Sequence, residues 1–244
     1  MTLFSSAREF GRLRELIAIL LKYGFDDIVR WLQMEGRIGW LRRWVRQDLP
    51  PEIRRLPSEA RARLALEEMG PTFVKLGQIL ATRVDLFPME WIEEFEKLQD
   101  NARPIPFEKL LPKIEKSLGK PVDKVFVSID PKPIGVASIG QVHRAVTRSG
   151  EQVVLKVQKP GIRSRIESDL RLLDQVAKLA ADNSVELRRY RPVELVREFE
   201  RSLGRELDFT SESRNADRIR DNMKAIKWLV VPKVYWEYTS AVLS

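Results

Sequence analysis

Residues 134–158 read IGVASIGQVHRAVTRSGEQVVLKVQ, and this stretch decides the fold. Residues 141–146 and 152–158 are two short segments rich in β-branched side chains, a composition typical of strands. The Arg-Ser-Gly-Glu sequence at 148–151 lies between them and is typical of a tight hairpin turn. We therefore expect an antiparallel hairpin that follows a loop of small residues.

Apolar residues recur at steps of three and four on both sides of this hairpin, which predicts helices. Before it, helices are expected over residues 8–46 with a break at Gly24, then over 59–69, 71–84, 91–98 and 107–118. After it, one helix is expected from beyond Gly161 to about Asn183, and another over 192–228 with a break near Gly204. Further strands are expected at 126–129, 230–235 and 241–243.

These segments predict an α+β fold in which a helical arm precedes a module with a five-stranded antiparallel sheet. Residues 1–56 form the expected amphipathic helical arm, and residues 57–120 form a helical extension of it. Residues 121–244 carry the predicted sheet and its helices. No internal repeat is found.

Composition limits the chemistry that this chain can support. Its 244 residues include no cysteine and one histidine, His143, which excludes disulfides, thiolate nucleophiles and paired imidazole sites. The net charge of +8 favours anionic partners such as nucleotides, nucleic acid or acidic lipid headgroups. The longest apolar run, 16–21, is far shorter than the roughly 20 residues of a membrane span, and no secretory signal is visible. We therefore expect a cytosolic location.

Lys156 is the first candidate for binding chemistry. It lies between aliphatic residues on the second strand of the hairpin, after a loop of small residues whose backbone amides can approach a phosphate. This combination is typical of the nucleotide-binding lobe of a kinase. The alternative for Lys156 alone is an edge-strand lysine that prevents aggregation.

A lysine between apolar neighbours needs an anionic partner, because burying an unpaired ammonium group is costly. The candidate acids are Glu206, Asp208 and Glu212. Spacing of two residues turns side chains to different helix faces, so one acid can pair with Lys156 while the others meet a second partner. Lys75 and Gln78 lie three apart on a predicted helix, and Gly77 between them permits close approach of a backbone or ligand. An ordinary solvated face is the alternative for these residues.

Four ordered motifs connect these candidates. They are GPTFVKLGQ at 70–78 with residues 83–88 downstream, ASIGQVHRA at 137–145, the segment 153–161, and ELDF at 206–209 with Glu212 and Asn215. Together they resemble the UbiB family of atypical protein-kinase-like proteins, also called AarF-domain or ADCK-type kinases. The resemblance covers residues 60–240, and the arm before Leu56 carries less of it.

The resemblance implies a protein-kinase-like N-lobe with an αC-like helix and an alanine-rich loop in place of the usual glycine-rich one. The nucleotide-binding residues it implies are Lys156, Ala137, Ser138 and Gly140. Glu212 would be the ion-pair partner of Lys156, and Glu206 with Asp208 would face Lys75 and Gln78, whose helix lies over the nucleotide pocket. Gly135 and Val136 stand where the family often has alanines, which implies altered loop flexibility or nucleotide preference.

The implied activity is that of an ATP-dependent kinase or ATPase, formally a transferase, that supports isoprenoid quinone (ubiquinone-type) biosynthesis at a membrane. ATP or ADP is expected with Mg²⁺. The catalytic and metal-binding residues of a kinase belong to a C-lobe, which is absent before Ser244, so no catalytic or metal-ligating residue is expected in this chain. We expect the N-terminal, catalytically incomplete part of such an enzyme.

A non-catalytic module that binds a membrane surface or a partner protein is the alternative. Trp31, Trp40 and Trp44 are interleaved with arginines in residues 28–46, and this pattern suits peripheral contact with an anionic membrane. Inward packing of the tryptophans, with the arginines on a solvated face, explains the same pattern more simply, because aromatic stripes on helices usually belong to a core. Nucleic-acid binding is not favoured, because 35 acidic residues are interspersed among 43 basic ones and no recognition motif is found. The phosphate acceptor and the oligomeric state stay open.

Overall fold

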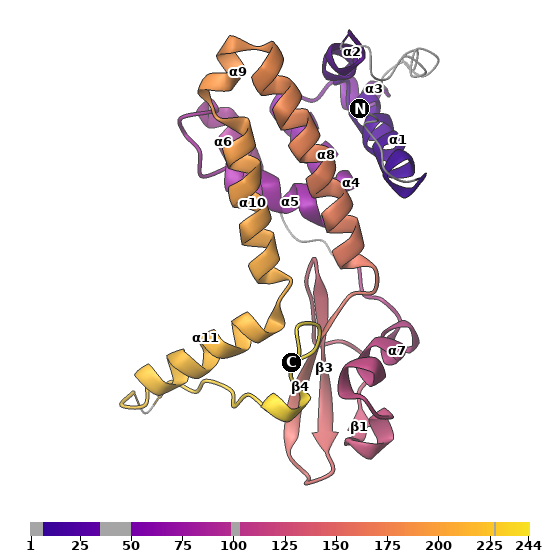
Figure 1. The fold of residues 1–244 in the computed structure, drawn as a ribbon, viewed down its shortest axis with the longest axis vertical. Helices are drawn as coiled ribbons and strands as arrows, with labels where there is room; N and C mark the ends of the chain where they lie inside the picture. Colours follow the sequence, from indigo (N-terminus) through magenta and orange to yellow (C-terminus); the bar gives the residue numbers. More distant parts are fainter. Residues whose placement is uncertain (1–6, 35–49, 99–102, 227) are drawn as a thin grey trace. The chain divides into compact units, whose positions relative to one another are not determined.

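A computed structural model describes residues 7–34, 50–98, 103–226 and 228–244 (Figure 1). They pack as two compact units. The first takes its residues from Met1–Asp100 and Ile166–Arg197, and the second from Asn101–Arg165 and Glu198–Ser244. The division into 1–56, 57–120 and 121–244 stays a prediction.

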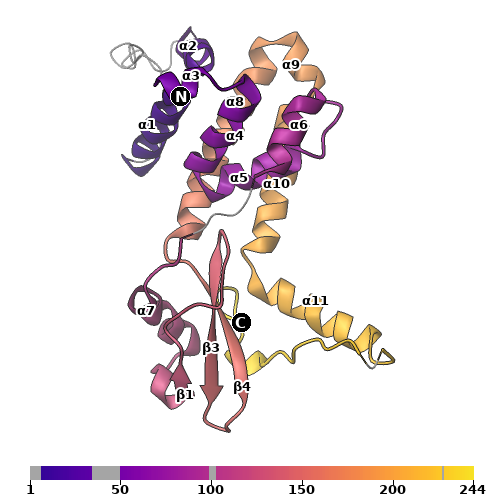
Figure 2. The same cartoon turned by 180° about the vertical axis from the view of Figure 1, so that it is seen from behind.

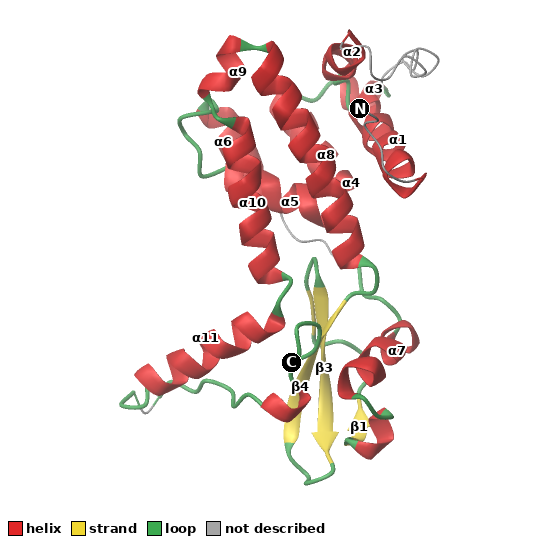
Figure 3. Cartoon of the chain, in the orientation of Figure 1, coloured by secondary structure: helices red, strands yellow, loops and turns green. Residues whose placement is uncertain are grey.

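The mixture of helices with a small antiparallel sheet confirms the α+β class (Figure 3). The helices are α1 (Ala7–Lys22), α2 (Asp26–Met34), α3 (Pro51–Arg54), α4 (Ser58–Met69), α5 (Pro71–Leu80), α6 (Met89–Glu96), α7 (Phe107–Leu118), α8 (Ile162–Asn183), α9 (Val185–Arg189), α10 (Pro192–Glu206) and α11 (Phe209–Asn222). The strands are β1 (Phe126–Ile129), β2 (Gly135–Val136), β3 (Gly140–Thr147) and β4 (Gln152–Gln158), and the short 3₁₀ helices are η2 (Val122–Lys124) and η3 (Trp236–Tyr238).

Strand β3 organises the sheet, because it pairs antiparallel with β1, β2 and β4. The register of β3 and β4 places Val142 opposite Lys156 and Val146 opposite Gln152. Gly150 closes the turn between them at φ 86°, a backbone conformation that favours glycine. The hairpin predicted from the sequence is confirmed.

The expectation of five strands is wrong, since the described residues form a sheet of four. Residues 230–235 form no strand, because Pro232 lacks an amide donor and the side chain of Val230 is 85% exposed. Residues 241–243 contribute only isolated bridges, from Leu243 to Val157 and to Ser240. The two-residue strand β2 was not among the predicted strands.

The long helical stretch after Pro192 is interrupted four residues later than expected. Gly204 lies inside α10, and the break falls at Leu207 and Asp208. The side chain of Asp208 accepts a hydrogen bond from the amide of Thr210 and thereby caps α11. A capping carboxylate stabilises a new helix start, whereas one glycine within a helix costs only about 1 kcal/mol.

Helix α7 covers one face of the sheet in the second unit, and both views show it beside β1 and β3 (Figure 1 and Figure 2). Its Leu110 and Ile114 are fully buried and share a core with Leu155 and Val157 of β4. Successive residues of a strand point to opposite faces. Lys156, between these two buried residues, therefore projects from the face opposite α7.

The core of the first unit is formed by α1 together with parts of α4, α5 and α8. Trp31 on α2 is half-buried against this core, which favours inward packing for this tryptophan. Trp40 and Trp44 lie outside the described residues. Among the helices that the structure describes, none is both long enough and apolar enough to span a membrane.

A buried ion pair ties these helices together. Arg12 on α1 donates from Nε to Oδ1 of Asp169 on α8 at 2.6 Å, and its second guanidinium nitrogen donates to the carbonyl of Met69, also at 2.6 Å. The hydroxyl of Thr72 donates to Oδ2 of the same aspartate at 2.6 Å. The Asp169 and Thr72 residues are each 1% exposed. The pair therefore links α1 and α8 to the joint at Gly70 between α4 and α5.

Gly77 on α5 lies where two leucines converge. A Cβ atom at this position would meet Leu98 Cδ1 at 2.2 Å and Leu66 Cδ1 at 2.9 Å. The expectation that Gly77 admits a backbone or a ligand is therefore corrected, because side chains of the same unit fill that space. The glycine allows α5 to pack closely against its neighbours.

We predict that Asp169→Asn destabilises the first unit by up to about 3–5 kcal/mol, because the buried Arg12 then loses its buried counterion and keeps only the half-exposed Glu15 as a charged partner. Urea denaturation measures the loss. Asp174→Asn on the same helix is the control, since it breaks only the exposed pair with Lys178 and should cost at most about 1 kcal/mol. Equal losses in both variants would contradict a special role for the buried pair.

We also predict that Gly77→Ala costs about 1–3 kcal/mol through overpacking against Leu98 and Leu66. Gly204→Ala is a matched control, because Gly204 is also helical but has no atom within 4 Å of the new methyl group. Alanine there should stabilise the helix by up to about 1 kcal/mol. Thermal denaturation of both variants measures the two effects, and a stabilising Gly77→Ala would show that the helices are free to separate.

Candidate functional site

Lys156 on β4 and Glu212 on α11 form an ion pair through Nζ and Oε2. The side chain of Lys156 is 27% exposed and that of Glu212 is 60% exposed. The ammonium group also lies 4.7 Å from the centroid of the Phe209 ring, within the range of a cation–π contact. Lys156 is thus held between a buried aromatic ring and an accessible carboxylate.

The outer edge of β4 is not open. The amide of Lys156 donates to the carbonyl of Ser244, and the amide of Ser244 donates to the carbonyl of Lys156 at 3.0 Å. The amide of Gln158 donates to Val242 at 3.0 Å. An unpaired edge strand is the setting in which a lysine protects against aggregation, so this pairing weakens that explanation of Lys156.

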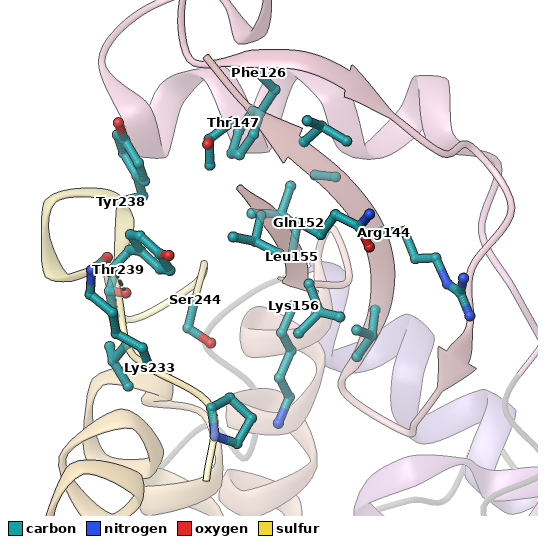
Figure 4. Close-up of a pocket in the computed structure, with 18 of the residues that line it drawn as sticks. Phe126, Arg144, Thr147, Gln152, Leu155, Lys156, Lys233, Tyr238, Thr239 and Ser244 are labelled. Carbon is teal, nitrogen blue, oxygen red and sulfur yellow. Dashed lines mark hydrogen bonds between the residues drawn. The ribbon is translucent and has the colours of Figure 1, made fainter. Parts of the chain in front are cut away.

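A cavity of 890 Å³ is lined by Lys156 together with other residues of the strands. Its walls come from the strands, from Glu212, Ser213 and Ala216 of α11, and from residues between Pro232 and Thr239. Figure 4 shows Lys233, Tyr238 and Thr239 on one side of the cavity, facing the strand residues. The volume is within the range of about 300–1,000 Å³ that is common for small-molecule sites.

The small-residue loop precedes β3 and is tightly turned. The amide of Ala137 donates to the carbonyl of Gly140 at 2.8 Å, and Ser138 lies within this turn. A Cβ atom at Gly140 would meet the carbonyl oxygen of Val157 at 2.9 Å and Cζ of Phe209 at 3.1 Å. Gly140 therefore permits close packing of β3, β4 and α11 directly beside Lys156.

Asp208 acts as the helix cap of α11 in this structure. Its Oδ1 accepts from the amide and the hydroxyl of Thr210 at 3.0 and 2.6 Å, and its Oδ2 accepts from the hydroxyl of Ser211 at 3.1 Å. The hydrogen bond from Thr210 lowers the pKa of Asp208 below its ordinary value. The carboxylate that caps the helix is therefore ionised at neutral pH.

The other predicted pocket residues lie in two different units. Glu206 ends α10 in the second unit, whereas Lys75 and Gln78 lie on α5 in the first. The amide group of Gln78 donates to the carbonyl of Leu98 at 3.2 Å. The pairing of Glu206 and Asp208 with Lys75 and Gln78 stays a prediction.

His143 is fully buried and both of its ring nitrogens are engaged. Its Nδ1 lies 2.8 Å from the carbonyl oxygen of Asp130, so Nδ1 carries the proton and donates. The amide of Gln141 donates to Nε2 at 2.8 Å. The ring also lies beside Phe107. His143 is therefore a packed, hydrogen-bonded strand residue.

Phe209 is a site residue whose role the sequence alone did not indicate. It is fully buried between Gly140 and Lys156. Phe209 and Glu212 are three residues apart, so they share one face of α11 and both reach Lys156. This spacing within the 206–212 segment is the signal that could have identified it.

Comparisons with known proteins identify the family of the chain. The model of the ABC1 atypical kinase-like domain matches residues 97–243. The chain is 39% identical over 237 residues to "Probable protein kinase UbiB" of Pseudomonas aeruginosa (strain UCBPP-PA14). The aligned region covers 94% of this chain and 43% of that protein. It is 38% identical over 236 residues to the protein of the same name from Vibrio parahaemolyticus. That alignment covers 95% of this chain and 43% of the relative.

A solved structure, the complex of Rv3197 with erythromycin from Mycobacterium tuberculosis, is 25% identical and covers 73% of this chain and 44% of that chain, with a TM-score of 0.42. This chain thus spans 43% of the length of the curated relatives described above. The family model covers more than half of the chain and includes the Lys156–Glu212 pair and the capped turn at Asp208. The chain belongs to the UbiB family of ABC1 atypical kinase-like proteins.

Proposed function

We propose that this chain forms the ATP-binding part of a UbiB-like atypical kinase or ATPase. The observation that carries the proposal is the Lys156–Glu212 ion pair between β4 and α11 at the edge of a cavity of 890 Å³. In kinases, a lysine on a strand paired with a glutamate on a neighbouring helix binds nucleotide phosphates. Membership of an atypical kinase-like family supports the same assignment.

The residues of this chain would hold the nucleotide in complementary ways. Lys156 would bind phosphate oxygens, and Glu212 would orient its ammonium group. Ser138 and Gly140 would offer backbone amides from the small-residue loop, and Ala137, whose amide is bonded to the Gly140 carbonyl, would hold the turn of that loop. ATP would arrive with Mg²⁺, which neutralises phosphate charge when bound. In the described part of the chain, no three carboxylate or imidazole groups are placed to hold a metal, so we assign none of its residues to Mg²⁺.

Two wider roles belong to the same proposal. The helix of Lys75 and Gln78 would cover the pocket and would meet Glu206 and Asp208, which restricts access by protein substrates. The whole protein would support isoprenoid quinone (ubiquinone-type) biosynthesis. Resemblance to the UbiB motifs and the name of the relatives support this role.

We predict that Lys156→Ala weakens binding of ATP with Mg²⁺ by about 10- to 100-fold, because a charge-assisted contact to phosphate is lost. Glu212→Gln should weaken it less, since the lysine stays. Isothermal titration calorimetry on the 244-residue chain measures both affinities. Lys124→Ala at the exposed end of η2 is the matched control and should bind like the unaltered chain.

Two results would contradict the proposal. Absence of ATP binding by the unaltered chain would remove the assigned function. Unchanged affinity of Lys156→Ala would show that nucleotide binds away from the ion pair.

Peripheral contact of a cytosolic protein with an anionic membrane is the second part of the proposal. The net charge of +8 and the arginine-rich segment that contains Trp40 and Trp44 support it. Trp31, the first tryptophan of that segment, packs against the core and does not contribute.

We predict that joint reversal of Arg42→Glu and Arg43→Glu reduces binding to phosphatidylglycerol vesicles by roughly 30-fold, at about 1 kcal/mol for each basic residue lost. Vesicle co-sedimentation measures the change. Reversal of the exposed Lys120 and Lys124 in the second unit is the matched control. Equal losses for the two pairs would mean that net charge alone attracts the protein.

A further inference from the structure

The carbonyl of Leu207 receives two side-chain hydrogen bonds. Leu207 lies between Glu206 and Asp208, at the turn from α10 to α11. Nε2 of Gln158 on β4 donates to this carbonyl at 3.1 Å, and the guanidinium group of Arg163 on α8 donates to it at 3.2 Å. Both donors and the acceptor belong to the second unit. The backbone of the turn is therefore fixed to β4 two residues after Lys156.

The orientation of the Gln158 amide group is determined from its other side. Gln158 is 1% exposed, and its Oε1 accepts from Nζ of Lys113 on α7 at 2.9 Å. Lys113 can only donate, so the amide oxygen must face α7 and the NH₂ group must face Leu207. Burial lowers the pKa of Lys113, and the nearby charge of Arg163 lowers it further. Gln158 is thus a neutral bridge between the ammonium group of Lys113 and the carbonyl of Leu207.

The fixed turn determines where α11 begins. Two residues beyond Leu207, the amide of Phe209 donates to the carbonyl of Ala241 at 3.1 Å. The Phe209 ring then fills the space beside Gly140, with Lys156 Nζ at 4.7 Å from its centroid. One helical turn later, Glu212 reaches the same ammonium group. A shift of this turn would move the ring and the carboxylate together.

We propose that Gln158, assisted by Arg163, is a positioning residue that holds α11 through the Leu207 carbonyl so that Phe209 and Glu212 meet Lys156. Gln158 itself touches neither Lys156 Nζ nor a ligand in this scheme. Its effect on nucleotide binding rests on the proposed function, whereas its effect on Lys156 does not.

The test measures the surroundings of Lys156 directly, by NMR of the 244-residue chain after reductive ¹³C-methylation of its lysines. Dimethyl-lysine keeps its positive charge. The aromatic ring of Phe209 should displace the Lys156 methyl signal upfield of the other lysine signals. Absence of that signal in Lys156→Arg assigns it, and loss of the displacement in Phe209→Leu confirms its origin.

Three substitutions by methionine separate the contacts of Gln158 and of the Leu207 carbonyl. Gln158→Met removes the donor to Leu207 at nearly constant size, and should abolish most of the upfield displacement. Arg163→Met removes the second, exposed donor and should abolish part of it. Lys113→Met is the matched control. It removes the other hydrogen bond of the same amide, but the Leu207 carbonyl can only accept and still orients the NH₂ group, so the displacement should stay intact.

The outcomes that overturn the inference are specific. A folded Gln158→Met that keeps the full displacement would show that the Leu207 contact does not position Phe209. Loss of the displacement in Lys113→Met as well would indicate general loosening of the core. Should Gln158→Met fail to fold, Arg163→Met with an unchanged signal overturns the inference.

ATP titration of the same variants distinguishes this inference from the proposed function. Loss of the displacement together with about five- to tenfold weaker ATP binding in Gln158→Met would support both. If the unaltered chain binds no ATP, the proposed function fails while the NMR result still decides the role of Gln158. If ATP affinity changes without any change at Lys156, the positioning role is wrong.

Discussion

The packing of Phe209 against Gly140 is the constraint on which the rest of the site depends. A side chain at residue 140 would collide with the carbonyl oxygen of Val157 and with the phenylalanine ring. Because glycine has no Cβ atom, the Phe209 ring packs against residue 140, and α11 approaches the β3–β4 hairpin closely enough for Glu212 to reach Lys156. The glycine of the small-residue loop thus has a packing role in addition to the phosphate-binding role proposed for the loop.

The size of its interaction free energy indicates that the Lys156–Glu212 pair contributes little to the stability of the fold. Glu212 is 60% exposed, and ion pairs at such positions contribute at most about 1 kcal/mol. The cation–π contact with Phe209 adds about 0.5–2 kcal/mol and does not require a carboxylate. The burial of Phe209, Leu155 and Val157 supplies far more apolar stabilisation. A lysine held at the edge of a cavity with so little benefit to folding supports a role in binding a ligand.

Sequence patterns predicted local structure well and contacts between distant elements poorly. The hairpin followed from its β-branched segments and from Gly150, and the joint at Gly70 followed from glycine and proline. Residues 230–235 were predicted as a strand from apolar composition, which outweighed the missing donor of Pro232. No pattern joined Arg12 to Asp169, 157 residues apart, because periodicity identifies the buried face of a helix but not its partner. The Gln158 contact left no signal either, since its acceptor is a backbone carbonyl that any residue provides.

Asp208 shows how a structural role and a predicted functional role can share one carboxylate. An ionised carboxylate offers about four acceptor positions, two on each oxygen. The two hydrogen bonds from Thr210 occupy Oδ1, and the bond from Ser211 occupies half of Oδ2. One position therefore remains, enough for a single further donor. A second donor would have to displace part of the helix cap. The capping bonds thus limit any binding role of this carboxylate to one hydrogen bond, unless the start of α11 is loosened.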